Sequence, residues 1–136
     1  MLVMRMMKEM ILMNNKINLT IWGRKFDLYY IYQNYSGEEV LPNQERTVEQ
    51  IPNADFQSAM EAVKRYILKH NKEELQEESI PNLFKYVMPK RILIPRETEK
   101  RVFAIMCNYK FDMEHGLAIV FENEKFAAVG LQDIIL

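Results

Sequence analysis

Asp112, Glu114 and His115 form the densest group of chemically capable side chains in the sequence. Because histidine titrates near neutral pH, a carboxylate-oriented His115 could serve as a general base. The same imidazole and carboxylates could instead bind a divalent cation. Asp133 is the fourth member of this candidate set. Together these residues would suit a small hydrolase or a metal-assisted enzyme.

A structural interpretation of the same residues is simpler. Asp112 can accept backbone amide hydrogens, and Gly116 supplies the conformational freedom of a tight turn between two strands. Zinc sites draw three or four protein ligands at defined spacing, whereas the only other histidine, His70, falls in a predicted helix. We therefore predict no catalytic residue, no metal and no cofactor, and we expect His115 to pack or hydrogen-bond locally.

The composition is that of an ordinary globular domain. The chain has 136 residues, of which 49% are hydrophobic and 27% charged, enough for one domain with a single core. Its formal net charge of -1 creates no global field for nucleic acid or acidic membrane, so we expect neither as a partner. The single cysteine, Cys107, lies among apolar residues, which indicates a buried small hydrophobe in a reduced, cytoplasmic protein.

A basic stretch in the second half of the chain could contact phosphate groups. Two glutamates interrupt it and no nucleic-acid motif accompanies it, so we interpret it as a solvated face. Its members are Lys85, Lys90, Arg91, Arg96, Lys100 and Arg101.

The first residues differ from the rest of the chain. Six of the ten methionines lie within residues 1–13, where Arg5, Lys8 and Glu9 break the apolar run that a signal peptide would need. We predict a poorly ordered leader at residues 1–15, followed by a single domain at residues 16–136. The alternatives are an adherent leader helix and an over-long translated start with the natural initiator near Met13.

In the N-terminal and central parts, the apolar residues change from the two-residue period of strands to the roughly 3.6-residue period of helices. Alternation over residues 16–21 and 25–32 predicts a hairpin turning at Gly23-Arg24. Residues 34–53 have a loop composition, with a short helical turn beginning at Thr47. Helical spacing predicts the main helix over residues 55–70. A solvated acidic turn at residues 72–79 and a brief helix ending at Pro89 follow.

The C-terminal part returns to strands. Residues 92–94 suit a sheet edge or a strand terminus before Pro95, and residues 101–109 are apolar on both faces, as in a central strand. Residues 117–121 and 125–129 predict a hairpin around Asn123-Glu124, where Glu124 is a poor choice for a type I′ turn. We therefore predict an α+β domain with an antiparallel sheet of about five strands and one main helix packed on one face.

The C-terminal pattern resembles a family of small uncharacterised bacterial domains, a domain of unknown function. Members carry an aromatic-Asp-x-Glu-His-Gly-Leu turn, a strand, an Asn-Gly hairpin and a Val-Gly-x-x-Asp ending. The resemblance covers residues 101–135. This sequence departs from the pattern at the hairpin, where Glu124 replaces the glycine. By analogy with comparable α+β domains, it implies an immunity-type or accessory protein. The residues that carry it are Phe111, Asp112, Glu114, His115, Gly116, Leu117, Val129, Gly130 and Asp133.

Two functional hypotheses follow. The first is a noncatalytic, cytoplasmic bacterial binding module whose partner is another protein. The alternative is the small hydrolase or metal-assisted enzyme that uses Asp112, Glu114 and His115. An enzyme should gather these groups in a cleft, whereas a binding module should present an exposed aromatic or charged patch.

Overall fold

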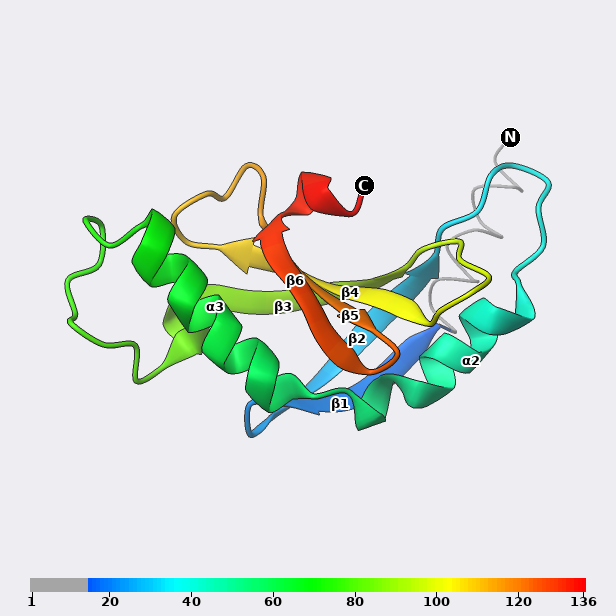
Figure 1. Cartoon of the computed structure of the whole chain (residues 1–136), viewed down its shortest axis with the longest axis horizontal. Coiled ribbons are helices and arrows are strands. Elements are labelled where there is room, and N and C mark those ends of the chain that lie inside the picture. The colour runs from blue at the N-terminus through cyan, green and yellow to red at the C-terminus, as the bar shows by residue number, and fades with distance from the viewer. Residues whose placement is uncertain (1–14) are drawn as a thin grey trace.

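The computed structural model describes residues 15–136 as one six-stranded sheet with two helices (Figure 1). The helices are α2 (Pro42–Gln50) and α3 (Phe56–His70). The strands are β1 (Lys16–Ile21), β2 (Arg24–Tyr32), β3 (Val87–Ile94), β4 (Val102–Tyr109), β5 (Leu117–Glu122) and β6 (Lys125–Leu131). The leader was predicted over residues 1–15, of which residues 1–14 lie outside the described residues.

The six strands lie in the sheet in their order along the chain. All neighbours are antiparallel except β2 and β3, which are parallel. Parallel neighbours need a crossover connection, and the segment that contains α2 and α3 provides it. The α+β class is confirmed. The predicted main helix is α3, and the sheet is mostly antiparallel as predicted. It has six strands where we predicted about five, and it differs further by one parallel pair and by a second helix, α2.

Helix α3 agrees closely with its prediction. The Asp55 side chain caps it by accepting the backbone N–H of Ser58 at 3.0 Å. Ala59, Val63 and Ile67 are buried at helical spacing and face the main core. In Figure 1, α2 and α3 follow one another along the same side of the sheet.

Helix α2 occupies nine of the residues in the segment 34–53 that was predicted as a loop. It begins at Pro42, a residue favoured in the first helical turn, and the Gln44 side chain accepts the Leu41 N–H at 2.9 Å. Thr47 therefore lies inside the helix, where its hydroxyl donates to Asn43 O at 2.8 Å. The prediction failed because Pro42 and Asn43 were interpreted as loop residues, although they start a helix here.

Strand β3 also differs from its prediction. A 3-10 turn at Leu83–Lys85 stands where we expected a helix ending at Pro89, and the strand already begins at Val87. Because β2 pairs only with residues 91–94, the part of β3 around Pro89 has a strand on one side only, where proline is tolerated. The strand does end before Pro95, as predicted, but it lies inside the sheet between β2 and β4.

Two tight turns join the antiparallel hairpins. Trp22 and Gly23 form the first, one residue earlier than predicted, with φ of 50° and 80°. Asn123 and Glu124 form the second, with φ of 49° and 68°, so both have the positive φ of a type I′ turn. Glu124 thus adopts the conformation that its residue type disfavours.

The two faces of the sheet bury unequal clusters. The helix-covered face carries the main core, in which Phe103 and Phe121 stack with ring centroids 4.8 Å apart. The opposite face carries a smaller cluster made of Val102, Ala104, Met106, Ala118 and Val120. Strand β4 contributes to both clusters, which confirms its prediction as a central strand. Within residues 15–136 no helix is long and apolar enough to cross a bilayer.

Candidate functional site

Three of the predicted functional residues, Asp112, Glu114 and His115, lie in the turn between β4 and β5, whereas Asp133 lies in the 3-10 turn Gln132–Ile134 that follows β6. Asp112 N–H donates to Tyr109 O at 3.1 Å, and Gly116 N–H donates to Asp112 O at 2.9 Å. The Asp112 carboxylate accepts the His115 backbone N–H at 3.1 Å, and His115 Nδ1 lies 3.0 Å from each carboxylate oxygen. One aspartate therefore organises both the backbone and the imidazole of this turn.

The contacts between Asp112 and His115 favour the charged form of both. The hydrogen bond from the His115 backbone N–H lowers the pKa of Asp112, and the hydrogen bond to the imidazole lowers it further. The hydrogen bond with Asp112 raises the pKa of His115, and the charge of the carboxylate adds to the effect. Because Nδ1 faces Asp112, Nε2 is the ring nitrogen that is left for a ligand.

The other two predicted residues are less closely involved. Of the hydrogen bonds between described residues, none joins Glu114 or Asp133 to the Asp112–His115 pair, and their charges act on His115 only by raising its pKa. Glu114 lines a small cavity together with His115. In the described part of the chain, no group of three or more histidine, cysteine or acidic side chains is placed to hold a metal ion.

Gly116 lets the turn close against the end of β6. Its φ of 65° is unfavourable for residues with a side chain, and a Cβ here would lie 2.8 Å from the backbone oxygen of Cys107. The Gln132 side chain fills the adjacent space and donates from Nε2 to Cys107 O at 3.1 Å. Cys107 itself is buried, and burial raises the pKa of its thiol. A buried neutral thiol matches the predicted role as a small hydrophobe.

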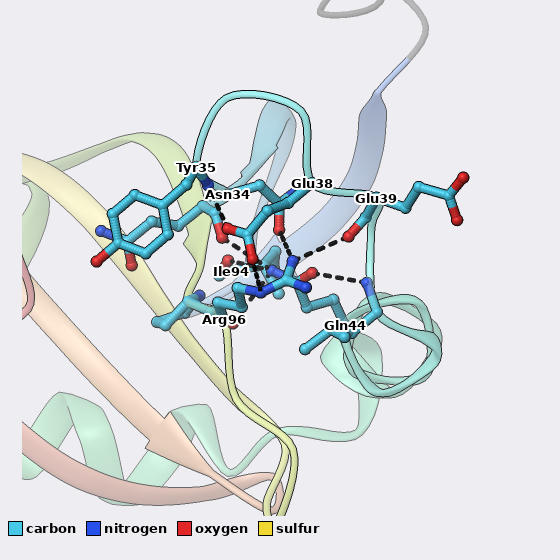
Figure 2. A network of polar contacts seen from close by, with 10 residues as sticks. Asn34, Tyr35, Glu38, Glu39, Gln44, Ile94 and Arg96 are labelled. Carbon is cyan, nitrogen blue, oxygen red and sulfur yellow. Dashed lines mark hydrogen bonds and ion pairs between the residues drawn. The ribbon is translucent and has the colours of Figure 1, made fainter.

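A second polar network lies at the opposite end of the sheet, where β3 ends at Ile94 (Figure 2). The Arg96 guanidinium donates from Nη1 to Asn34 Oδ1 at 2.6 Å and to Glu39 O at 2.9 Å. Its Nε lies 3.2 Å from Glu38 Oε2. One arginine therefore binds three residues of the loop that follows β2.

Gln44 anchors the same loop from helix α2. Its side chain is buried, and Nε2 lies within 3.3 Å of the carbonyl oxygens of Gln33, Ile94 and Pro95. A buried side-chain amide needs such partners, since an unpaired one is costly. Gln44 thus joins α2, the end of β2 and the end of β3.

Tyr35 stands on this anchored loop yet is 82% exposed. Its backbone N–H donates to Glu38 Oε1 at 2.8 Å, so the main chain is held although the ring is free. In Figure 2 the ring points away from the guanidinium group. Gln33, Asn34, Tyr35 and Arg96 line a cavity of about 270 Å³ beside it.

Sequence reasoning missed this Tyr35 loop, defined here as residues 33–39 together with Arg96. The one available signal was an aromatic residue in a segment of loop composition, next to Ser36-Gly37. Arg96 belonged to the basic stretch that we interpreted as a solvated face. Its partners Asn34 and Glu38 are about sixty residues earlier in the chain, a separation that no local pattern records.

The fold and these two polar regions define a small α+β protein with one mixed sheet covered by helices on one face. The chain belongs to the family described as "Domain of unknown function (DUF6985)", which it matches over residues 8–136. Comparisons with curated proteins and with solved structures found no match.

Proposed function

We propose that this protein is a noncatalytic binding module that recognises another protein through the Tyr35 loop. The observation that carries the proposal is an 82% exposed tyrosine on a backbone that Arg96 and Gln44 hold in place. In line with the sequence interpretation, we place it in the bacterial cytoplasm, with an immunity-type or accessory role.

Energetic considerations support the Tyr35 loop as a protein-binding surface. Tyrosine and arginine are enriched among the residues that dominate protein interfaces, and Tyr35 and Arg96 line the same cavity. A loop that is already ordered loses little conformational entropy on binding. The exposed ring therefore contributes apolar contact at small entropic cost, and the adjacent Arg96 and Asn34 offer polar contacts at its edge.

The test is affinity capture from an extract of the source cell, followed by calorimetry with the purified partner. We expect Tyr35→Ala to raise the dissociation constant by about 30-fold, which corresponds to a residue that contributes about 2 kcal/mol to the binding free energy. Tyr29→Ala is the matched control, since Tyr29 is a 40% exposed tyrosine on β2 outside the loop. A partner that binds the Tyr35→Ala protein as tightly as the wild type would refute the proposal.

The second candidate function is the small hydrolase or metal-assisted enzyme. The Asp112–His115 contact favours it, because a carboxylate that orients an imidazole is the usual arrangement of a general base. Dialysed protein should be titrated calorimetrically with zinc, manganese and calcium. A one-to-one isotherm that His115→Ala abolishes would favour the metal-assisted enzyme over the binding module.

A further inference from the structure

Strand β3 contains a β-bulge at Lys90. The register with β4 passes from Pro89 opposite Cys107 to Arg91 opposite Met106, so Lys90 is the extra residue. Side chains of a regular strand alternate between faces, but the bulge interrupts this alternation. Lys90 and Arg91 are therefore both exposed, and Ile92 returns to the buried core.

These two cations differ from the rest of the basic stretch. Neither Lys90 nor Arg91 forms an ion pair with any described residue, whereas the other four members each face a carboxylate. The four pairs are Lys85 with Glu77, Arg96 with Glu38, Lys100 with Glu122, and Arg101 with Glu124. Among the described residues, Lys90 and Arg91 are therefore the two cations of this stretch whose charges no ion pair balances.

Both side chains line a cavity of about 110 Å³ on the face of the sheet opposite the helices. The side chains of Asn108, His115 and Gln132 line the same cavity. Two of them are held in place, because His115 bonds Asp112 and Gln132 donates to the carbonyl oxygen of Cys107. The lining thus combines two cations with fixed hydrogen-bonding groups.

The charge and size of the cavity select the kind of ligand. Glu114 is the one carboxylate in the lining, so Lys90 and Arg91 leave it net positive. Pockets for drug-sized ligands run to about 300–1,000 Å³, so this smaller space fits a single charged group. One arginine guanidinium can donate hydrogen bonds to both oxygens of a planar carboxylate, whereas a tetrahedral phosphate accepts hydrogen bonds from several directions.

We propose that this cavity binds a phosphate group. Lys90 and Arg91 make the ionic contacts, and Asn108, Gln132 and His115 donate hydrogen bonds to the remaining oxygens. The bulge is the device that creates the site, because without it one of the two cations would point to the opposite face.

The experiment is a titration followed by the backbone amide signals of 15N-labelled full-length protein at constant ionic strength. The probes are inorganic phosphate, O-phosphoserine and acetate. We expect saturable shifts at Lys90, Arg91, Gly116 and Gln132 with phosphate, and much weaker ones with acetate. If O-phosphoserine binds more tightly, the natural ligand is a phosphate group carried on a larger molecule. If inorganic phosphate binds more tightly, the natural ligand is the free ion.

Arg91→Gln should raise the dissociation constant for phosphate about tenfold, the usual effect of losing a charge-assisted hydrogen bond. Arg46→Gln is the matched control, an exposed arginine of α2 that does not line this cavity. Both substitutions are at exposed positions, and the unshifted amide signals of the core report that the fold is intact. Equal weakening by the two variants, acetate binding as tight as phosphate, or shifts that do not saturate would overturn the proposal.

Discussion

Gln132 donates from Nε2 to the carbonyl oxygen of Cys107 at 3.1 Å, across the position where any residue but glycine would place a Cβ. The hydrogen bond joins the end of β6 to β4, and Gly116 lies between them. A Cβ at Gly116 would stand 2.5 Å from Gln132 Nε2 and 2.8 Å from Cys107 O. The C-terminal end of the turn that holds Asp112 and His115 is thus closely packed at Gly116.

Gly116→Ala should therefore destabilise the protein by about 3 kcal/mol, the sum of left-handed backbone strain and overpacking. Gly37→Ala is the control, because Gly37 has a φ of 84° but no atom lies within 4 Å of the point that its Cβ would occupy. It should cost only about 1 kcal/mol from the backbone strain. Urea unfolding of both variants measures the difference, and equal losses would mean that the Gln132 side chain and the Cys107 carbonyl both move away at no cost.

Ile67→Asp should unfold or nearly unfold the protein, with a loss of about 4 kcal/mol or more, because it buries an unpaired charge. Ile67 is fully buried in the main core, whereas its neighbour Leu68 is 38% exposed. Leu68→Asp should change the free energy of unfolding by only about 0.5 kcal/mol. Thermal melts followed by circular dichroism compare the two. Similar melting temperatures would mean that α3 does not pack through Ile67.

Glu124→Gly should be more stable than Glu124→Ala by about 1–2 kcal/mol, since alanine keeps the cost of a positive φ and glycine does not. Both variants lose the two contacts of Glu124 with Arg101, at 2.8 and 2.9 Å, so the comparison isolates the backbone. Denaturant unfolding measures it. If alanine proved as stable as glycine, the turn would have changed to another type.

Arg96→Lys should loosen the Tyr35 loop almost as much as Arg96→Gln does. A lysine is a point charge and cannot bond Asn34, Glu38 and Glu39 together as the planar guanidinium does. Hydrogen exchange of the Tyr35 amide, which donates to Glu38, is the measurement. Faster exchange is expected in both variants, whereas protection restored by lysine would show that charge alone anchors the loop.

The Asp112–His115 pair should make stability depend on pH in a defined window. The pKa of His115 is raised above 6.5, so its contribution is present below pH 6.5 and is lost as the pH rises through the folded value. The pKa of Asp112 is lowered below 3.8, so its contribution is present above pH 3.8 and is lost as the pH falls through the folded value. The stability difference between wild type and His115→Gln should therefore be greatest between pH 3.8 and 6.5.

Unfolding curves of both proteins from pH 3 to 9 provide this measurement. The control is Asp112→Asn, in which the titration midpoint of His115, followed by NMR, should fall toward 6.5. A constant stability difference across the range would show that the imidazole contributes through packing alone.

The predictions that succeeded depend on neighbours in sequence. Helix α3 was predictable because Ala59, Val63 and Ile67 repeat at the helical period and Asp55 caps the first turn. The local hydrogen bonds of Asp112 and His115 were predictable because aspartate bonds backbone amides two or three residues ahead. The errors at α2 and β3 arose at Pro42 and Pro89, since proline begins helices and occurs in one-sided strands as well as in loops.

The sequence by itself determined the α+β class, the main helix, the buried faces of the strands and the local chemistry of the Asp112 turn. These features follow from the period of the apolar side chains and from hydrogen bonds between near neighbours, and both involve only residues that are close in sequence. Only the tertiary structure decided that β2 and β3 run parallel, that Arg96 binds Asn34, and that a bulge turns Lys90 and Arg91 toward one cavity. Those relationships join residues far apart in sequence, and they exist only after the crossover through α2 and α3 has brought β3 beside β2.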